Sequence, residues 1–318
     1  MRIPPDRPTT LAPELSTVER RVAASIVRVA SRVSRTLALA IALGWLAYTL
    51  VSWTLVWDPA DAGAYYDSAL RLVSGEELYP AVDPEAHEVY RYAPWFAAAW
   101  IPMTALPRDL AIHLWSLAMV ACSLAAVWPL LRKPSWASVT LAALMGQTLL
   151  ETAIYGNAHP AVVALLVWTA HLRSFPAWVG VAASIKLVPL AFVLVWFGRR
   201  EWRSGATALA VAAVLFAPML LMDLSNYVTD PGTGLASLYA VSPVLWLAAS
   251  TAGAVICVWL AVRRSPYAWL AVALLMFLGP PRVTTSYLAF ILVAVELEER
   301  DRASGRRLKT PPPGASPA

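Results

Sequence analysis

Acidic and aromatic residues gather directly behind the first long apolar run of this chain. The stretch WDPADAGAYYDSALRLVSGEELYP, residues 57–80, follows the uncharged run ALAIALGWLAYTLVSWTLVW, residues 38–57. A carboxylate at a membrane boundary can act as general base for a hydroxyl nucleophile, and partial burial raises its pKa towards a useful range. Tyrosine and tryptophan faces offer stacking surfaces for sugars. These residue types therefore indicate proton abstraction from a hydroxyl.

Asp61 is the first candidate for that base, and Asp58 is the second. The segment 61–73 predicts a helix that lies along the membrane surface and ends at Ser74-Gly75, since glycine suits a helix C-terminus. Asp61 falls at its N-terminus, where the helix dipole favours a carboxylate. An ordinary N-cap for Asp61 and a turn residue before Pro59 for Asp58 are the structural alternatives. Asp67 is expected to face water.

Two cationic residues, Lys186 and Arg282, are candidates for binding an anionic group of a substrate. Lys186, in GVAASIKLVPLAF, lies about ten residues from Pro176, which at about 1.5 Å per residue is deep in a bilayer. Such a lysine costs about 2.5–3.5 kcal/mol on insertion scales and usually faces a cavity or a counter-charge; snorkelling is the alternative. Arg282 follows Pro280-Pro281 and precedes the hydroxyls of TTS, a combination that suits a phosphate.

The turn LLETAIYGNAHPAVVALL is polar for a connection between two apolar runs, with Asn157 and His159 as its candidates for chemistry and a purely structural turn as the alternative. The four histidines show no ligand spacing and no glycine-rich phosphate loop occurs, so neither a metal nor a cofactor is expected. Cys122 and Cys257 lie in apolar runs and read as small core residues.

Composition places most of the chain in lipid. The 318 residues are 59% hydrophobic and only 14% charged, and apolar runs of bilayer length recur throughout. We expect an all-α polytopic membrane protein, a helical bundle with an N-terminal tail that carries a basic amphipathic helix (1–35), a transmembrane domain (36–298) and a disordered tail (299–318). About ten spans are predicted, near residues 37–57, 93–106, 110–131, 136–154, 158–172, 176–197, 204–222, 239–262, 266–279 and 283–297.

The charge distribution predicts the orientation. Residues 1–35 hold seven arginines against three acids, whereas 58–92 hold eight acids against two arginines. By the positive-inside rule, both termini are cytoplasmic and 58–92 is the first extracytoplasmic loop of a plasma-membrane protein. Nothing suggests nucleic-acid binding. With ten spans, several cations land outside: either one hairpin is miscounted or they bind an anionic headgroup. These cations are Arg132, Lys133, Arg173 and Arg282.

Four blocks, taken in order, resemble glycosyltransferase family 87, the polyprenol-phosphate-mannose-dependent enzymes of the GT-C class. They are DAGAYYDSALRLVSGEELY, YRYAPWFAAAWIPMTALP, YGNAHPAVVALL and GVAASIKLVPLAFVLVWFGRREWR. In the second block Ala93 replaces a family proline. In the third, Asn157 and His159 stand where the family typically shows G-Q-x-N, and the span count puts this block on the inner side.

The resemblance implies an outward-facing, inverting and metal-independent transfer of a sugar from a polyprenyl phosphate to a lipid or glycan acceptor. Asp61 matches the catalytic carboxylate by its spacing to Tyr65, with Asp58 as the alternative. The resemblance also assigns binding of the donor phosphate to Lys186, Arg282 and Arg91. It assigns the sugar and acceptor to Tyr65, Tyr66, Tyr92, Asn157 and His159. The expected role is glycolipid synthesis in the cell envelope, with mannose and arabinose both open as the sugar.

Two other classes of function remain. A lipid or sugar transporter or flippase tends to carry midplane acids and paired repeats with broken helices. No convincing internal repeat occurs here, and the acids lie in an outer loop. The second alternative is a non-catalytic membrane protein descended from the same family, which the altered third block keeps open.

Overall fold

The computed structural model describes residues 59–81, 89–133, 135–227 and 237–309, with a few single positions before residue 52. The chain divides into two units, Met1–Trp45 and Leu46–Ala318, and the architecture below belongs to the second. The predicted basic N-terminal helix and first span lie almost entirely outside the described residues. Asp58 lies outside them as well.

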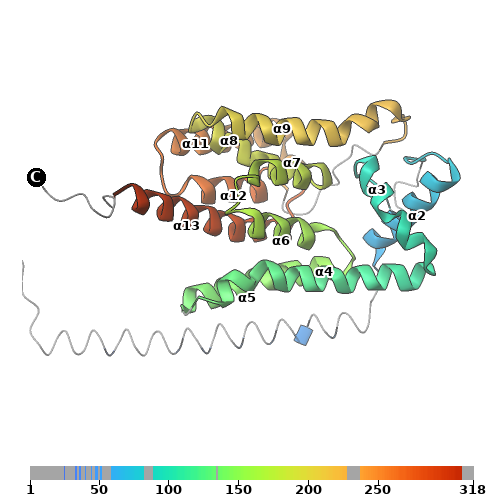
Figure 1. Ribbon diagram of the computed structural model, residues 1–318, viewed down its shortest axis with the longest axis horizontal. Coiled ribbons are helices and arrows are strands. Elements are labelled where there is room, and N and C mark those ends of the chain that lie inside the picture. Colours follow the sequence, from blue (N-terminus) through green and yellow to red (C-terminus); the bar gives the residue numbers. More distant parts are fainter. Residues whose placement is uncertain are drawn as a thin grey trace, which may run out of the picture. The chain divides into compact units, whose positions relative to one another are not determined.

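All regular structure in the described ranges is helical, which confirms the all-α prediction (Figure 1). The α-helices are α2 Ala60–Ser74, α3 Pro94–Trp100, α4 Arg108–Leu131, α5 Trp136–Ile154, α6 His159–Thr169, α7 Phe175–Ile185, α8 Val193–Gly198, α9 Trp202–Phe216, α10 Leu238–Val241, α11 Pro243–Val262, α12 Ala268–Leu278 and α13 Phe290–Lys309. Short 3-10 helices join them: η1 Ile101–Ala105, η2 Val188–Phe192, η3 Ala217–Leu221 and η4 Thr285–Ala289.

Four helices among the described residues are long and apolar enough to cross a membrane: Arg108–Leu131, Trp136–Ile154, Trp202–Leu221 and Pro243–Val262. Four shorter apolar helices accompany them: His159–Thr169, Phe175–Ile185, Val188–Gly198 and Ala268–Leu278. Only 11% of the most apolar window of α11 is buried inside the protein, so its remaining apolar surface needs lipid around it. The chain is therefore a multi-pass membrane protein.

The predicted span 176–197 is not one helix but a helical hairpin. Helix α7 ends at Lys186, whose backbone is extended (φ −136°, ψ 119°), and η2 then begins at Val188. The ring of Phe175 lies 5.9 Å from the ring of Trp196, so the chain has folded back between them. Pro189 explains the break, because proline lacks the N–H of a helical hydrogen bond and clashes with the preceding turn.

The predicted span 93–106 is also interrupted, as α3 and η1. Its buried residues Phe96 and Trp100 pack around Tyr65 of α2, with ring centroids 5.0 Å and 5.4 Å away. The segment therefore belongs to the same end of the protein as α2. Within the described residues, the expected span count thus differs from the structure at two places: 93–106 is not a crossing, and 176–197 is not a single crossing.

The corrected path gathers three of the four misplaced cations, Arg132, Lys133 and Arg173, at one end of the helix bundle. Lys133, after α4, binds Glu296 (2.9 Å) and Glu299 (2.8 Å) of α13. Arg300 of α13 donates to the carbonyl of Ala170, after α6 (3.0 Å). Arg199, after α8, pairs with Asp301. The turns that carry Arg132, Lys133 and Arg173 thus meet α13 and the arginines after α8, as the miscounted-hairpin alternative requires.

Helix α2 forms the opposite end. It follows the predicted segment closely, ends at Gly75 with φ +71°, and buries Ala62, Tyr65 and Ala69 completely, which share one face at helical spacing. Asp67 does not simply face water: both its oxygens accept from Arg108 at the start of α4, at 3.2 Å. The 24 residues of α4 rise about 36 Å, which separates this end from Lys133.

Candidate active site

The turn between α5 and α6 holds Asp61 in place. The Asp61 N–H donates to the carbonyl of Tyr155 (3.1 Å), and Asn157 Nδ2 donates to Asp61 Oδ2 (2.8 Å). The amide oxygen of Asn157 accepts from the His159 N–H (2.9 Å), which fixes the direction of the amide. Asp61 Oδ1 has no hydrogen-bond partner among the described residues. One carboxylate oxygen is thus held and the other remains available for a substrate proton.

Asp61 does not act as an N-cap in this arrangement. The N-cap position of α2 is Pro59, with no side-chain capping bond, and Asp61 lies in the first turn. Its carboxylate therefore sits where the helix dipole stabilises negative charge. The ten-span count places the third block on the side of the membrane opposite Asp61, and this placement is wrong, because the Asn157 side chain hydrogen-bonds to Asp61.

Gly156 lets the turn approach α2 this closely. Its φ is +67°, and a Cβ there would lie 2.5 Å from the Cβ of Ala62 and 3.1 Å from the Ala62 nitrogen. Trp115 of α4 holds the same residue from the other side, since its indole Nε1 donates to the Gly156 carbonyl (2.7 Å). Only glycine combines this conformation with this contact.

A chain of hydroxyls leads away from the turn. The N–H of Ala158 donates to the Tyr65 hydroxyl (3.3 Å), which donates to the Tyr92 hydroxyl (2.7 Å). Tyr65 is completely buried, and burial, followed by the nearby Tyr92 and Asp61, raises its pKa well above the ordinary value. Both tyrosines therefore stay neutral around neutral pH and act as hydrogen-bond donors.

Lys186 reaches this cluster from the tip of the α7–η2 hairpin. Its ammonium lies 5.6 Å from the ring centroid of Tyr287, and it interacts electrostatically with Tyr92 and Asp61. Burial raises the pKa of Tyr92, the Lys186 charge lowers it and the Asp61 charge raises it. Trp95, close to Tyr92 in the chain, donates to Ser184 at the end of α7 (3.1 Å), which ties the two segments together. A carboxylate, an ammonium group and a phenol thus share one site.

The other predicted site residues occupy different positions. Arg282 is exposed and interacts electrostatically with Lys186. Arg91 is exposed as well, and its carbonyl accepts from the Tyr227 hydroxyl (3.0 Å). Tyr66 is buried and donates to the Leu106 carbonyl (2.9 Å), which gives it a packing role between α2 and η1.

The His159 side chain is fully buried in the helix bundle. Its Nε2 lies 2.9 Å from the carbonyl of Ser286, and its ring contacts those of Tyr287 and Phe290. It therefore joins α6 to η4. The structure gathers five predicted residues into one cluster: Asp61, Tyr65, Tyr92, Asn157 and Lys186. No group of three metal-ligating side chains occurs within the described ranges.

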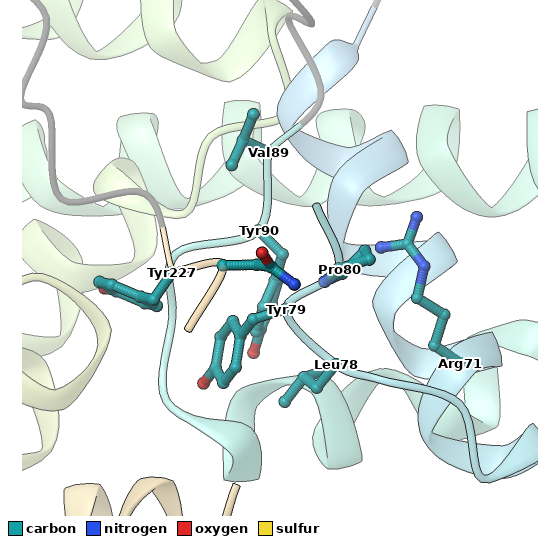
Figure 2. A pocket seen from close by; sticks show the side chains of 8 residues that line it. Arg71, Leu78, Tyr79, Pro80, Val89, Tyr90 and Tyr227 are labelled. Atoms are coloured by element: carbon teal, nitrogen blue, oxygen red, sulfur yellow. The ribbon is translucent and has the colours of Figure 1, made fainter. Parts of the chain in front are cut away.

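Sequence reasoning missed the residues that fix Tyr92. Three tyrosine hydroxyls donate to three consecutive carbonyls: Tyr227 to Arg91 (3.0 Å), Tyr79 to Tyr92 (2.8 Å) and Tyr90 to Ala93 (2.8 Å). Figure 2 shows these three tyrosines, here called the tyrosine clamp, together beside Pro80. The density of tyrosine in 79–92 is a sequence signal, but the distant Tyr227 has none.

Comparison with known proteins finds one family that is similar to part of this chain. Residues 90–230 match the model described as glycosyltransferase family 87. No curated protein and no solved structure was found to match the chain. The matched residues contain Tyr92, Asn157 and Lys186 and three of the four sequence blocks, while Asp61 precedes them. The chain thus carries a glycosyltransferase family 87 domain over residues 90–230.

Proposed function

We propose that this protein transfers a sugar, with mannose as the first candidate, from a polyprenyl phosphate to a lipid or glycan acceptor on the extracytoplasmic face. The family domain over residues 90–230 supports transferase activity at a membrane, and the donor, the sugar and the side of the membrane are our proposal. The observation that carries it is the pairing of Asp61, with one oxygen held by Asn157 at 2.8 Å, with Lys186 in the same cluster.

The reaction is a single in-line displacement. Asp61 takes the proton of an acceptor hydroxyl, whose oxygen attacks the anomeric carbon of the donor sugar. The bond from that carbon to the phosphate oxygen breaks, and its electron pair stays on the polyprenyl phosphate. Lys186, with Arg282 at the exposed edge, stabilises the charge that develops on this leaving group. The anomeric configuration is inverted because only one displacement occurs.

An apolar groove supports a lipid-linked donor. It has a volume of about 430 Å³ and lies between α11 and α12, with Ser250 as the one hydroxyl among its otherwise apolar lining. Its lining includes Gly279 and Val283, which lie on either side of Arg282 in the sequence. A hydrocarbon chain in this groove brings its phosphate towards Arg282 and, beyond it, Lys186.

A lipid or sugar transporter is the second candidate. The interrupted helix at Lys186 favours it, because transporters bind substrates at broken helices. Against it stands the held carboxylate of Asp61, which a transfer reaction uses and the movement of a lipid does not require.

Sugar transfer by the Asp61→Asn variant tests the proposal. Membranes that contain the wild-type protein or the variant receive a radiolabelled polyprenyl-phosphate mannose, and the label that enters new glycolipid is measured. We expect Asp61→Asn to lose about 10²- to 10⁴-fold in rate, the usual contribution of a general base. Near-normal transfer would exclude Asp61 as the base.

Asp67→Asn is the matched control, since it lies in the same helix and pairs with Arg108 at 3.2 Å. It should keep its transfer rate. Asp58→Asn, three residues before Asp61, separates the two candidate bases. A transporter would move the labelled lipid between leaflets in both the wild type and Asp61→Asn without forming new glycolipid.

A further inference from the structure

We infer that the Tyr92 hydroxyl donates a hydrogen bond to a phosphate oxygen of the bound donor lipid. Tyr92 then binds the phosphate of the donor. The family resemblance of the sequence had assigned it to the sugar or the acceptor instead. The inference rests on the proposed function only in taking a prenyl phosphate as the donor.

The direction of the hydroxyl chain carries the inference. Tyr65 is 0% exposed, so its proton needs an acceptor within the protein. That acceptor is the Tyr92 oxygen at 2.7 Å, while the Ala158 N–H at 3.3 Å occupies the oxygen of Tyr65. The hydroxyl proton of Tyr92 therefore points away from Tyr65. No acceptor for it occurs among the described residues, and Tyr92 is only partly buried.

The surrounding charges select the partner. Lys186 interacts electrostatically with Tyr92, so a group that accepts from Tyr92 also feels the ammonium charge. A phosphate oxygen gains from both, because hydrogen bonds to ionised acceptors are about twice as strong as neutral ones. Asp61 also interacts with Tyr92 and repels an anion, which suits a site where the acceptor hydroxyl lies between carboxylate and phosphate.

The tyrosine clamp holds Tyr92 in place as a hydrogen-bond donor. The carbonyls of Arg91, Tyr92 and Ala93 are each held by a hydroxyl of the clamp at 2.8–3.0 Å. The Tyr92 ring also packs edge-on against Tyr65, with centroids 4.9 Å apart. A donor that is fixed before the substrate binds loses little entropy on binding and needs no reorganisation during the reaction.

Binding of a short prenyl phosphate tests the inference without any transfer step. The full-length protein in nanodiscs is titrated with citronellyl phosphate and with the uncharged alcohol citronellol, and both dissociation constants are measured. Tyr92→Phe should weaken binding of the phosphate about 10- to 100-fold, the usual loss of a hydrogen bond to a charged group, and leave the alcohol unchanged. Tyr65→Phe should weaken binding of citronellyl phosphate by less, because the Tyr92 hydroxyl remains and loses only the contact that orients it.

Tyr66→Phe is the matched control, since it removes a neighbouring buried hydroxyl that donates to the Leu106 carbonyl at 2.9 Å. It should bind both compounds as the wild type does. Equal phosphate binding by Tyr92→Phe and wild type would overturn the inference, as would an equal loss for phosphate and alcohol. Because no sugar transfer is measured, a failed transfer assay would leave this result intact, and the reverse also holds.

Discussion

Gly156 determines where the Asp61 carboxylate stands, and its substitution is the first test at the scale of single residues. In Gly156→Ala the new Cβ would lie 2.5 Å from the Ala62 Cβ, at a φ of +67° that alanine rarely adopts. We expect a loss of about 2–4 kcal/mol in stability, from strain and overpacking together, and a strong loss of transfer. Thermal unfolding and sugar transfer measure the two effects.

Gly75→Ala provides the control, because Gly75 has the same kind of φ (+71°) but open space within 4 Å of the new Cβ. It should cost only about 1 kcal/mol and keep the transfer rate. If both variants lose activity equally, backbone conformation rather than the contact with Ala62 explains the effect.

Asn157 is expected to orient the base rather than to bind sugar. Asn157→Ala removes the 2.8 Å hydrogen bond to Asp61, and we expect a fall in kcat of about tenfold or more with little change in the acceptor KM. Asn157→Asp brings a second carboxylate to Asp61, and one of two adjacent carboxyl groups retains its proton. The acidic limb of its pH–rate profile should therefore move to higher pH. A change confined to the acceptor KM would assign Asn157 to sugar binding instead.

The sequence singles out Asp61, Lys186 and Asn157 as candidates, but it does not predict the contacts between them. Asp61 and Lys186 stand out because a carboxylate behind a span and a lysine within an apolar run are costly and conspicuous. The partner of Asp61 is 96 residues away in the chain, and Tyr227 lies 136 residues from the carbonyl it holds. Such pairs depend on tertiary packing, which local spacing does not encode.

At the scale of helices, the break at Lys186 changes the path of the chain. An apolar run of about 20 residues fits one span as well as two short helices, so hydropathy alone predicts a single crossing. A proline such as Pro189 loosens a helix, but the reversal of the chain depends on packing such as the 5.9 Å contact between the rings of Phe175 and Trp196. The hairpin brings Lys186 to the site as a loop residue rather than as a charge in mid-helix.

Helix α13 joins the ends of several other helices through Asp301. Its carboxylate accepts from Arg199 and from the indole of Trp269 (2.8 Å), and the Arg199 side chain is only 10% exposed. Asp301→Ala leaves that arginine charge without its partner, and we expect a loss of about 2–3 kcal/mol, below the value for a fully buried pair. Thermal unfolding in detergent should show a clear fall in Tm, with transfer retained by the folded protein.

Glu298→Ala is the comparison on the same helix, because its partner Arg302 is 63% exposed. An exposed pair at i,i+4 contributes about 0.5 kcal/mol or less. Equal effects of the two variants would mean that Asp301 does not join the helix ends.

For the whole molecule, the corrected helix path removes three of the four exceptions to the positive-inside rule, those at Arg132, Lys133 and Arg173. The turns at 132–135, 170–174, 199–201 and 263–267 carry the basic residues, and the first three contact α13. The opposite end carries Asp61, Glu76, Glu77 and Asp223. The positive-inside rule then predicts that the basic end is cytoplasmic and the Asp61 site extracytoplasmic. Arg282, near Lys186 at the site end, is the one exception of the ten-span count that remains on the outer side.

Labelling of single cysteines from outside intact cells tests this orientation. With Cys122 and Cys257 replaced by alanine, Ser225→Cys should react with a membrane-impermeant maleimide, because Ser225 is exposed at the site end. His171→Cys, exposed in the α6–α7 turn, should react only after the membrane is permeabilised. The turn is decisive because the ten-span count and the corrected path place it on opposite sides. Labelling of both positions in intact cells would restore the outer location of Arg173, and the basic end would then need an anionic partner outside the cell.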